Sequence, residues 1–231
     1  MMADIGSDYR ITGETLARAD VERFAAVSRP FHLVDCDLED ADCGHLELRG
    51  WQFERCNLRR TNFVSARLEG SVWQSCRAAF ANFSRADLAE ARIISCDINN
   101  AVFRGAIVSS VLFDQSKLTG ADFTEAKSFD VKFRETLLIN AKLGGMSFRK
   151  QTLNRVDFSQ ADLRKCDFRA TSFEGCSLRD AQVAGAHFEA ADLRGADLGG
   201  FRLSDATLFR GATISREQAG QLLDELGLNV R

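Results

Sequence analysis

Residues 161–170 read ADLRKCDFRA, and residues 191–200 read ADLRGADLGG. Each stretch is a pair of five-residue blocks that begin with a small residue, continue with Asp and place Leu or Phe third. Divided into fives from Phe31, the chain keeps this phase for 36 blocks, and the third residue is large and apolar in 33 of them. The exceptions are Cys43, Ala78 and Ser128. A five-residue repeat therefore extends from Leu33 to Leu208.

This period fits neither the 3.6-residue period of a helix nor the two-residue period of a strand. It is explained if each block forms one side of a square, so that the chain turns a corner after every block and closes a coil after four. The third residue and the small residue two positions before it then both point inward. One of the two must be small, because bulk at both inward positions would overfill the interior. The sequence predicts an all-β solenoid of about nine coils.

The blocks Ala161-Asp162-Leu163 and Cys166-Asp167-Phe168 resemble the motif of the pentapeptide-repeat family. The resemblance covers most of the chain and implies a right-handed quadrilateral β-helix. We expect an N-terminal capping segment over residues 1–30, the β-helix over residues 31–210, and a C-terminal helix and tail over residues 211–231.

Sorting the blocks by coil places chemically similar residues in columns. One inward column holds five cysteines: Cys36, Cys56, Cys76, Cys96 and Cys176. Another face stacks four rings: Phe63, Phe83, Phe103 and Phe123. A metal site needs sulfurs that converge on a point, and a disulfide needs a dihedral angle that parallel side chains do not provide. We therefore interpret both columns as core packing.

Both ends of a solenoid need a cap, because the terminal coils leave apolar surface and backbone groups uncovered. Residues 12–28 carry apolar side chains at helical spacing and are followed by Pro30, which predicts an N-terminal capping helix. At the other end, Ser215 and Gln218 form a capping box before a leucine-rich helix that Gly227 stops. This second helix covers the last coil alone or also pairs with a copy of itself.

The C-terminal segment, residues 212–230, resembles the helix that makes a two-fold, tail-to-tail dimer in the gyrase-interacting branch of the family, the Qnr and MfpA type. The resemblance implies a homodimer. The residues expected at its interface are Leu222, Leu223, Leu226, Leu228 and Val230.

Catalytic chemistry is not indicated. The three histidines, His32, His45 and His187, occupy solvent-facing repeat positions on different faces, and no phosphate loop, metalloprotease motif or nucleophile elbow is present. The repeat Asp that follows the small residue is expected to bind turn backbone. We predict a protein that is not an enzyme, with no cofactor and no metal. We also expect a cytoplasmic location, because no signal peptide or membrane span is recognised and seven cysteines indicate free thiols.

Two functional classes remain open. The resemblance implies a DNA-mimicking protein that binds DNA gyrase or topoisomerase IV and protects it from quinolones or natural poisons, without binding nucleic acid itself. The alternative is a scaffold for an unidentified protein partner. The net charge is only -3, and no face carries a strong stripe of carboxylates, which weakens the case for a DNA mimic.

Partner contacts are expected at the one dense acidic cluster and at outward apolar residues. The candidates are Asp37, Glu39, Asp40, Phe80, Ile94, Leu112 and Phe129. Phe80 and Phe129 each lie beside a block whose third residue is small, so each ring either turns inward at a bulge or is exposed.

Overall fold

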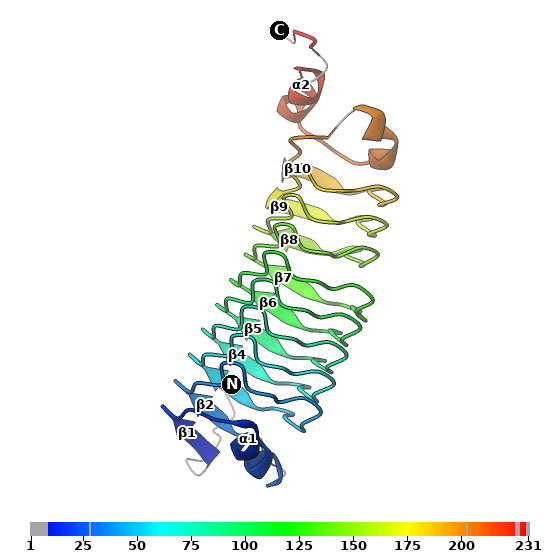
Figure 1. Ribbon diagram of the computed structural model, residues 1–231. Helices are drawn as coiled ribbons and strands as arrows, with labels where there is room; N and C mark the ends of the chain where they lie inside the picture. The colour runs from blue at the N-terminus through cyan, green and yellow to red at the C-terminus, as the bar shows by residue number, and fades with distance from the viewer. Residues whose placement is uncertain (1–8, 28, 202, 225–226, 230–231) are drawn as a thin grey trace. The chain divides into compact units, whose positions relative to one another are not determined.

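The computed structural model describes the chain except for residues 1–8, 28, 202, 225–226 and 230–231 (Figure 1). The chain divides into two compact units. The N-terminal unit comprises Met1–Lys117 with Glu125–Lys132, and the C-terminal unit comprises Leu118–Thr124 with Phe133–Arg231. The all-β solenoid of about nine coils that the sequence predicts is confirmed.

In the N-terminal unit the strands pair in chain order, and all the pairs are parallel. They lie one beside the next on a single side of the coils (Figure 1). The strands are β1 (Arg10–Thr12), β2 (His32–Val34), β3 (Gln52–Glu54), β4 (Val72–Gln74), β5 (Arg92–Ile94) and β6 (Leu112–Asp114). From β2 onward each residue faces the residue 20 positions later, as His32 faces Gln52.

The C-terminal unit repeats this pattern, again with parallel pairs in chain order. Its strands are β7 (Lys132–Arg134, of which residues 133–134 belong to this unit), β8 (Thr152–Asn154), β9 (Ser172–Ser177) and β10 (Asp192–Asp197). A register shift at Gly195 interrupts the pairing of β9 with β10. After it come the 3₁₀ helix η2 (Leu203–Phe209) and the helix α2 (Arg216–Asp224).

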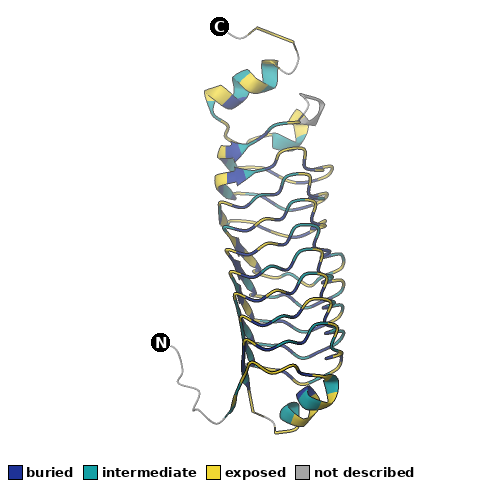
Figure 2. Ribbon diagram, turned by 60° about the vertical axis from the view of Figure 1, so that its left-hand side comes forward, coloured by how far each residue is buried: buried dark blue, intermediate teal, exposed yellow. Residues whose placement is uncertain are grey.

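We name the four sides of a coil faces A to D. Face A contains the blocks 31–35, 51–55 and so on, face B the blocks 36–40, 56–60 and so on, face C the blocks 41–45, 61–65 and so on, and face D the blocks 46–50, 66–70 and so on. Strands β2 to β8 all lie on face A. Buried and exposed residues alternate along each coil, as the five-residue pattern requires (Figure 2).

The corners depend on a conformation that the sequence analysis did not predict. In every block from 31–35 to 186–190 the fifth residue has a positive φ, and 25 of these 32 residues are not glycine. A β-carbon disfavours the left-handed backbone conformation, which Gly, Asn and Asp adopt most readily. The chain therefore accepts a small conformational cost at nearly every corner in order to turn there.

Stacked rings fill the interior. In the N-terminal unit the centroids of Phe63 and Phe83 are 5.1 Å apart with nearly parallel planes, and those of Phe83 and Phe103 are 4.9 Å apart. The predicted column is thus confirmed for these three rings, while Phe123 belongs to the C-terminal unit and contacts Phe133 edge-on at 6.0 Å.

The cysteines are all free and buried, in agreement with their interpretation as core residues. Burial raises the pKa of Cys43 and that of Cys166 to about 12, so both stay protonated thiols. The face B column also accepts hydrogen bonds from the backbone. The amide of Cys76 donates to the sulfur of Cys96 at 3.3 Å, and the amide of Cys96 donates to the hydroxyl of Ser116 at 3.0 Å.

This column has a local explanation. At other corners the first residue of a block donates its amide to the carbonyl three residues back, as Ala66 does to Phe63 at 3.0 Å. At Cys76 and Cys96 the corner before face B instead uses a side chain from the following coil, so that a small residue with an acceptor atom suits the next coil there. Sulfur and hydroxyl side chains meet both requirements.

The N-terminal cap differs in detail from the prediction. The helix expected within residues 12–28 is α1 (Arg18–Ala25), and the strand β1 before it was not predicted. Phe24 and Tyr9 pack on Phe31 at 5.0 and 5.3 Å between centroids. Arg18 donates to the carbonyl oxygens of Asp42 and Gly44. Helix and strand together cover the first coil.

Candidate protein-interaction surfaces

The acidic cluster predicted on face B is neutralised by the next coil. Arg60 donates to both carboxylate oxygens of Asp40 at 2.7 Å and to Glu39 at 2.7 Å. The side-chain amide of Asn57 donates to Asp37 at 3.0 Å and to Glu39 at 2.8 Å. The bonds from Arg60 also lower the pKa of Asp40. These three carboxylates are therefore already bound to donors of the chain.

The repeat Asp residues also bind locally, which confirms their predicted role in the turns. Asp162 accepts the amide of Arg164 at 3.1 Å and two bonds from its guanidinium at 2.8 and 2.6 Å. Asp167 with Arg169, and Asp192 with Arg194, repeat this arrangement. Hydrogen bonds from the arginine lower the pKa of Asp167 and that of Asp192 to about 2. Each Asp and Arg thus cancels most of the other's charge.

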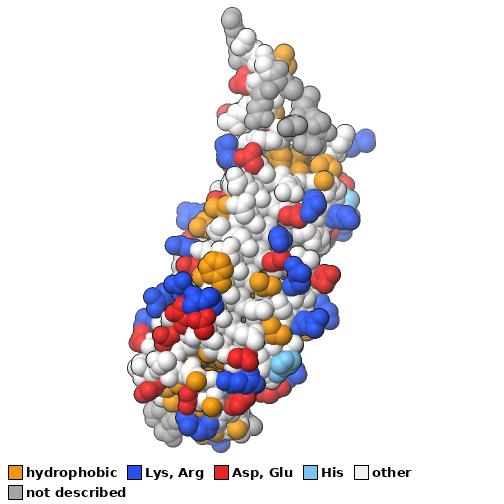
Figure 3. All heavy atoms as spheres, in the orientation of Figure 1, with side chains coloured by type: hydrophobic (Ala, Val, Ile, Leu, Met, Phe, Trp, Pro, Cys, Tyr) orange, Lys and Arg blue, Asp and Glu red, His pale blue; other side chains and the backbone are white. Residues whose placement is uncertain are grey.

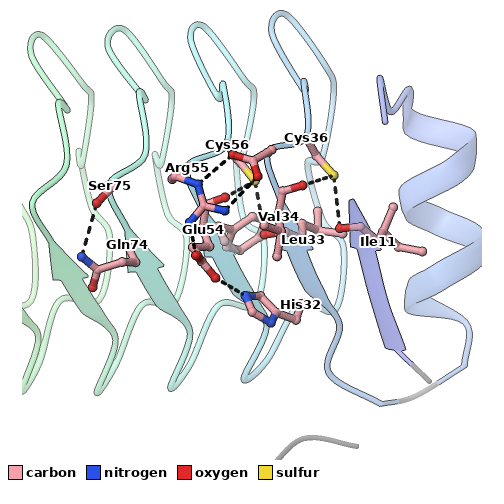
Figure 4. A network of polar contacts seen from close by, with 12 residues as sticks. Ile11, His32, Leu33, Val34, Cys36, Glu54, Arg55, Cys56, Gln74 and Ser75 are labelled. Carbon is pink, nitrogen blue, oxygen red and sulfur yellow. Dashed lines mark hydrogen bonds and ion pairs between the residues drawn. The ribbon is translucent and has the colours of Figure 1, made fainter. Parts of the chain in front are cut away.

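A second network lies at the corner between faces A and B (Figure 4). Arg55 donates two bonds of 2.8 Å to Asp35 and also pairs with Glu54. His32 lies 3.0 Å from Glu54 and is half-buried, so it is less open to solvent than its repeat position suggests. His187 lies 3.7 Å from Glu189 and is exposed. Oppositely charged neighbours, either from consecutive coils or from the same block, are the common feature of these faces.

Phe80 and Phe129 are both exposed, by 55% and 82% of their surfaces. Phe80 lies at the corner between faces B and C, whereas Phe129 lies on face D. Ile94 and Leu112 are half-buried on the paired strands β5 and β6 of face A, where Ile94 faces Asp114 and Leu112 faces Arg92. The structure therefore does not bring the predicted contact residues together on one surface. On the face drawn in Figure 3, most hydrophobic side chains likewise lie singly among residues of both charges.

The small residue beside Phe80 is explained by a residue on the next face. Ala78 is fully buried, and Trp73 in the same coil is buried as well. The indole of Trp73 stacks on Phe53 at 4.3 Å and meets Phe63 and Phe83 edge-on at 5.4 and 5.6 Å. A large indole and a small Ala on adjacent faces of one coil together conserve its interior volume. Phe80 therefore has no vacant interior position to fill.

The C-terminal unit ends in an apolar cavity of about 360 Å³. Leu222 and Leu223 line it from α2. The other lining residues are Leu198, Phe201, Ala206, Phe209, Ala212, Ile214 and Ala219. Leu228 is 54% exposed, while Leu226 and Val230 of the predicted dimer interface lie outside the described residues. The helix covers the last coil without filling the space beneath it.

Gln218 joins the helix α2 to the last coil, a role that the sequence analysis predicted only in part. The predicted capping box is present, since the amide of Ser215 donates to the Gln218 oxygen at 2.6 Å and the amide of Gln218 donates to the Ser215 hydroxyl at 3.2 Å. The side-chain nitrogen of Gln218 also donates to the carbonyl oxygens of Leu193 and Ala196, both at 2.7 Å. It thus replaces donors that a further coil would supply.

Comparison with protein families agrees with this geometry. A model described as a pentapeptide repeat region matches residues 31–103, and one described as pentapeptide repeats matches residues 96–127, 132–169 and 171–208. The chain belongs to the pentapeptide-repeat family. A comparison with curated protein sequences finds no match.

Among solved structures, this pentapeptide-repeat protein is similar to full-length QnrB1, a plasmid-mediated fluoroquinolone resistance protein. The TM-score is 0.64 at 20% identity, and the match covers 95% of this chain and 97% of the QnrB1 chain. A trypsin-treated QnrB1 variant matches with a TM-score of 0.60, also at 20% identity, over 96% of this chain and 98% of the other. The likeness establishes a shared fold. Among the described residues, no helix is long and apolar enough to cross a membrane.

Proposed function

We propose that this protein binds a bacterial type II topoisomerase, DNA gyrase or topoisomerase IV, and protects it from a quinolone or a natural poison. It acts as a cytoplasmic binding protein without catalysis and without binding nucleic acid itself. The observation that carries the proposal is the match to a fluoroquinolone resistance protein, which covers 95% of this chain and 97% of the other.

The mode of binding proposed is competition with DNA for the enzyme. A protein that presents carboxylates along a β-helix can occupy a cationic channel that normally holds a duplex. In this chain the carboxylates on face B are paired with Arg60 and Asn57. To occupy the channel, these carboxylates must bind cationic groups of the enzyme while they remain bound to their partners within the chain. Because such contacts join exposed charges, which salt screens, binding should weaken steeply with added salt.

The pairing of the carboxylates also favours the second candidate function, a scaffold for a different protein partner. Most of the acidic side chains on face B are bound to donors of the chain itself, which leaves a nearly neutral surface. Such a surface suits a partner that is not strongly cationic.

One experiment separates the two functions. Purified protein is added at micromolar concentration to gyrase and to topoisomerase IV, in supercoiling or decatenation assays and in quinolone-induced DNA cleavage assays. Under the first proposal, cleavage complexes fall with increasing protein, and added duplex competes with the protein. No effect on either enzyme, in either kind of assay, would leave the scaffold function as the better explanation.

We further propose that the protein is a homodimer through its C-terminal unit. Support comes from the exposed Leu228 and from the open apolar cavity beneath α2, which Leu222 and Leu223 line. Leucines of a second copy can cover this surface, and a two-fold pairing buries the same patch on both copies.

The dimer is tested with Leu228→Asp, which changes a side chain that is already exposed and so spares the cap. The matched control is Asn229→Asp, which adds the same charge one residue further along the chain. Light scattering should give the mass of a monomer for Leu228→Asp and of a dimer for the control. An unchanged mass for Leu228→Asp together with Leu222→Asp would contradict the tail-to-tail model.

A further inference from the structure

A column of stacked rings runs through the interior of the C-terminal unit and ends at Phe209. Successive ring centroids are 4.9 Å apart from Phe148 to Phe168, 5.0 Å from Phe168 to Phe188 and 4.6 Å from Phe188 to Phe209. The first three rings of this column are fully buried. Phe209 is only half-buried, so the last ring of the column keeps an uncovered surface.

The position of Phe209 results from one extra residue in the last coil. Asp192 pairs with Thr213, which lies 21 residues later, whereas paired residues of the preceding strands lie 20 apart. Phe209 likewise lies 21 residues after Phe188, and it stacks at the place where the five-residue frame puts Leu208. After this ring the chain continues into α2 instead of into a further coil (Figure 1). The column therefore stops where the ring of another coil would lie.

The apolar cavity of the C-terminal unit lies at this end of the column. Phe209 and Phe201 line it, with their centroids 5.1 Å apart, and α2 contributes Ala219, Leu222 and Leu223 to its wall. All of the described residues that line the cavity are apolar, and its volume is about 360 Å³. Because a cavity of about 150 Å³ lined by Leu, Ile and Phe binds benzene, this one has room for two or three fused rings.

We propose that this cavity binds a small, uncharged, planar aromatic molecule, which stacks on Phe209 as the next ring of the column. The half-buried ring supplies the aromatic surface, and the described residues of the wall are all apolar, which disfavours a charged ligand. A cavity of this size with an apolar lining is typical of small-molecule sites. The inference goes beyond the proposed function and does not rest on topoisomerase binding.

The ligand and the proposed dimer occupy different parts of this end of the chain. Leu228, the exposed leucine of the dimer model, is not among the residues that line the cavity. A second copy that pairs through Leu228 can cover the mouth of the cavity and leave its interior to the ligand. The leucines of a second copy are the competing occupant, and the experiment distinguishes them from a small molecule.

The probe is 1-naphthylamine, which is uncharged at neutral pH and whose fluorescence changes in apolar surroundings. Its binding to the full chain is measured by fluorescence titration, with naphthalene and its saturated analogue decalin compared as competitors. We expect saturable binding of one probe per chain. Phe209→Leu keeps the wall apolar but removes the ring, so the preference for naphthalene over decalin should fall about fivefold relative to the unchanged protein.

A second variant fills the cavity from the helix. Ala219→Leu adds a branched side chain to the wall, so the affinity for 1-naphthylamine should fall about tenfold, while the melting temperature should not decrease. The matched control is Gln221→Leu, which introduces the same side chain at an exposed position of α2 that does not line the cavity. Its affinity for the probe should equal that of the unchanged protein.

Saturable binding that is lost in Ala219→Leu and kept in Gln221→Leu would support the inference. No saturable binding to the unchanged protein would overturn it, as would an affinity that Ala219→Leu leaves unchanged, because the probe would then lie elsewhere. An equal preference for naphthalene in Phe209→Leu would show that the ring does not select the ligand. If only Leu228→Asp binds the probe, the leucines of a second copy fill the cavity and the assignment to a small molecule is wrong.

Discussion

Replacing Gln218 should open the C-terminal end of the solenoid. The side chain is 7% exposed and donates to the carbonyl oxygens of Leu193 and Ala196. It also accepts the amide of Ser215. Gln218→Ala leaves three polar backbone groups without this partner, and each such loss costs about 1 kcal/mol when the group stays partly accessible to water. We expect the free energy of unfolding to fall by about 3 kcal/mol.

A second substitution isolates the donor role. Gln218→Glu keeps an oxygen for the amide of Ser215 but places a carboxylate against the carbonyl oxygens of Leu193 and Ala196. If the side chain serves mainly as a donor to the last coil, Glu should destabilise the unit at least as much as Ala at neutral pH. If it serves mainly as a helix cap, Glu should be nearly harmless, because Ser with Glu is also a capping box.

The assay is urea unfolding followed by circular dichroism, combined with hydrogen exchange at the amides of the last coil. Gln221→Ala is the control, because this residue is exposed on the same helix. A cost below about 0.5 kcal/mol for Gln218→Ala, equal to that of the control, would refute the reasoning, since surface substitutions lie in that range.

Three further predictions concern the repeat. The pKa of Asp167 and that of Asp192 lie at about 2 instead of 3.8, so the stability they contribute is present above pH 3.8 and is lost as the pH falls toward 2; the urea midpoint should drop over that range, and less so in Asp167→Asn with Asp192→Asn. Gly195→Ala should destabilise the C-terminal unit by about 1–3 kcal/mol, because a β-carbon there would lie 2.5 Å from the carbonyl oxygen of Phe173. The control is Gly144→Ala, whose β-carbon would lie 3.4 Å from the carbonyl oxygen of Arg164, and equal melting temperatures for the two variants would contradict the prediction. Cys96→Ala should cost about 1 kcal/mol more than Cys96→Ser in urea unfolding, because only Ser retains an acceptor for the amide of Cys76, and equal costs would show that this hydrogen bond contributes nothing.

Several parts of the site could be predicted because their causes are local or periodic. The capping box of Ser215 and Gln218 lies within one helical turn, and the turn role of Asp162 involves only the amide two residues ahead. The proximity of Arg60 to Asp40 follows from the coil length, since residues 20 apart are neighbours in a stacked coil. That these carboxylates are not free could be learned only from the hydrogen bonds in the structure, because side chains of this length can reach several partners.

Other features involve contacts that no sequence spacing encodes. Trp73, in the same coil as the small Ala78, packs against Phe53 and Phe63, and this packing depends on the orientation of an indole among several rings. The carbonyl partners of Gln218 are 25 and 22 residues away, at a point where Gly195 shifts the register. A periodic frame cannot supply these contacts where the repeat itself is interrupted.

The sequence by itself determined the fold of this protein, because a period of five kept over 36 blocks allows one inward set of side chains and one direction of stacking. The tertiary structure alone decided what the surface offers to a partner. Which carboxylates are neutralised and whether Phe80 is exposed depend on side-chain conformations and on packing across a coil. A repeat constrains the interior residues strongly, because their volumes must fill the coil, whereas it leaves the outward residues free to vary. Binding to a partner therefore depends on outward residues, which the repeat does not specify.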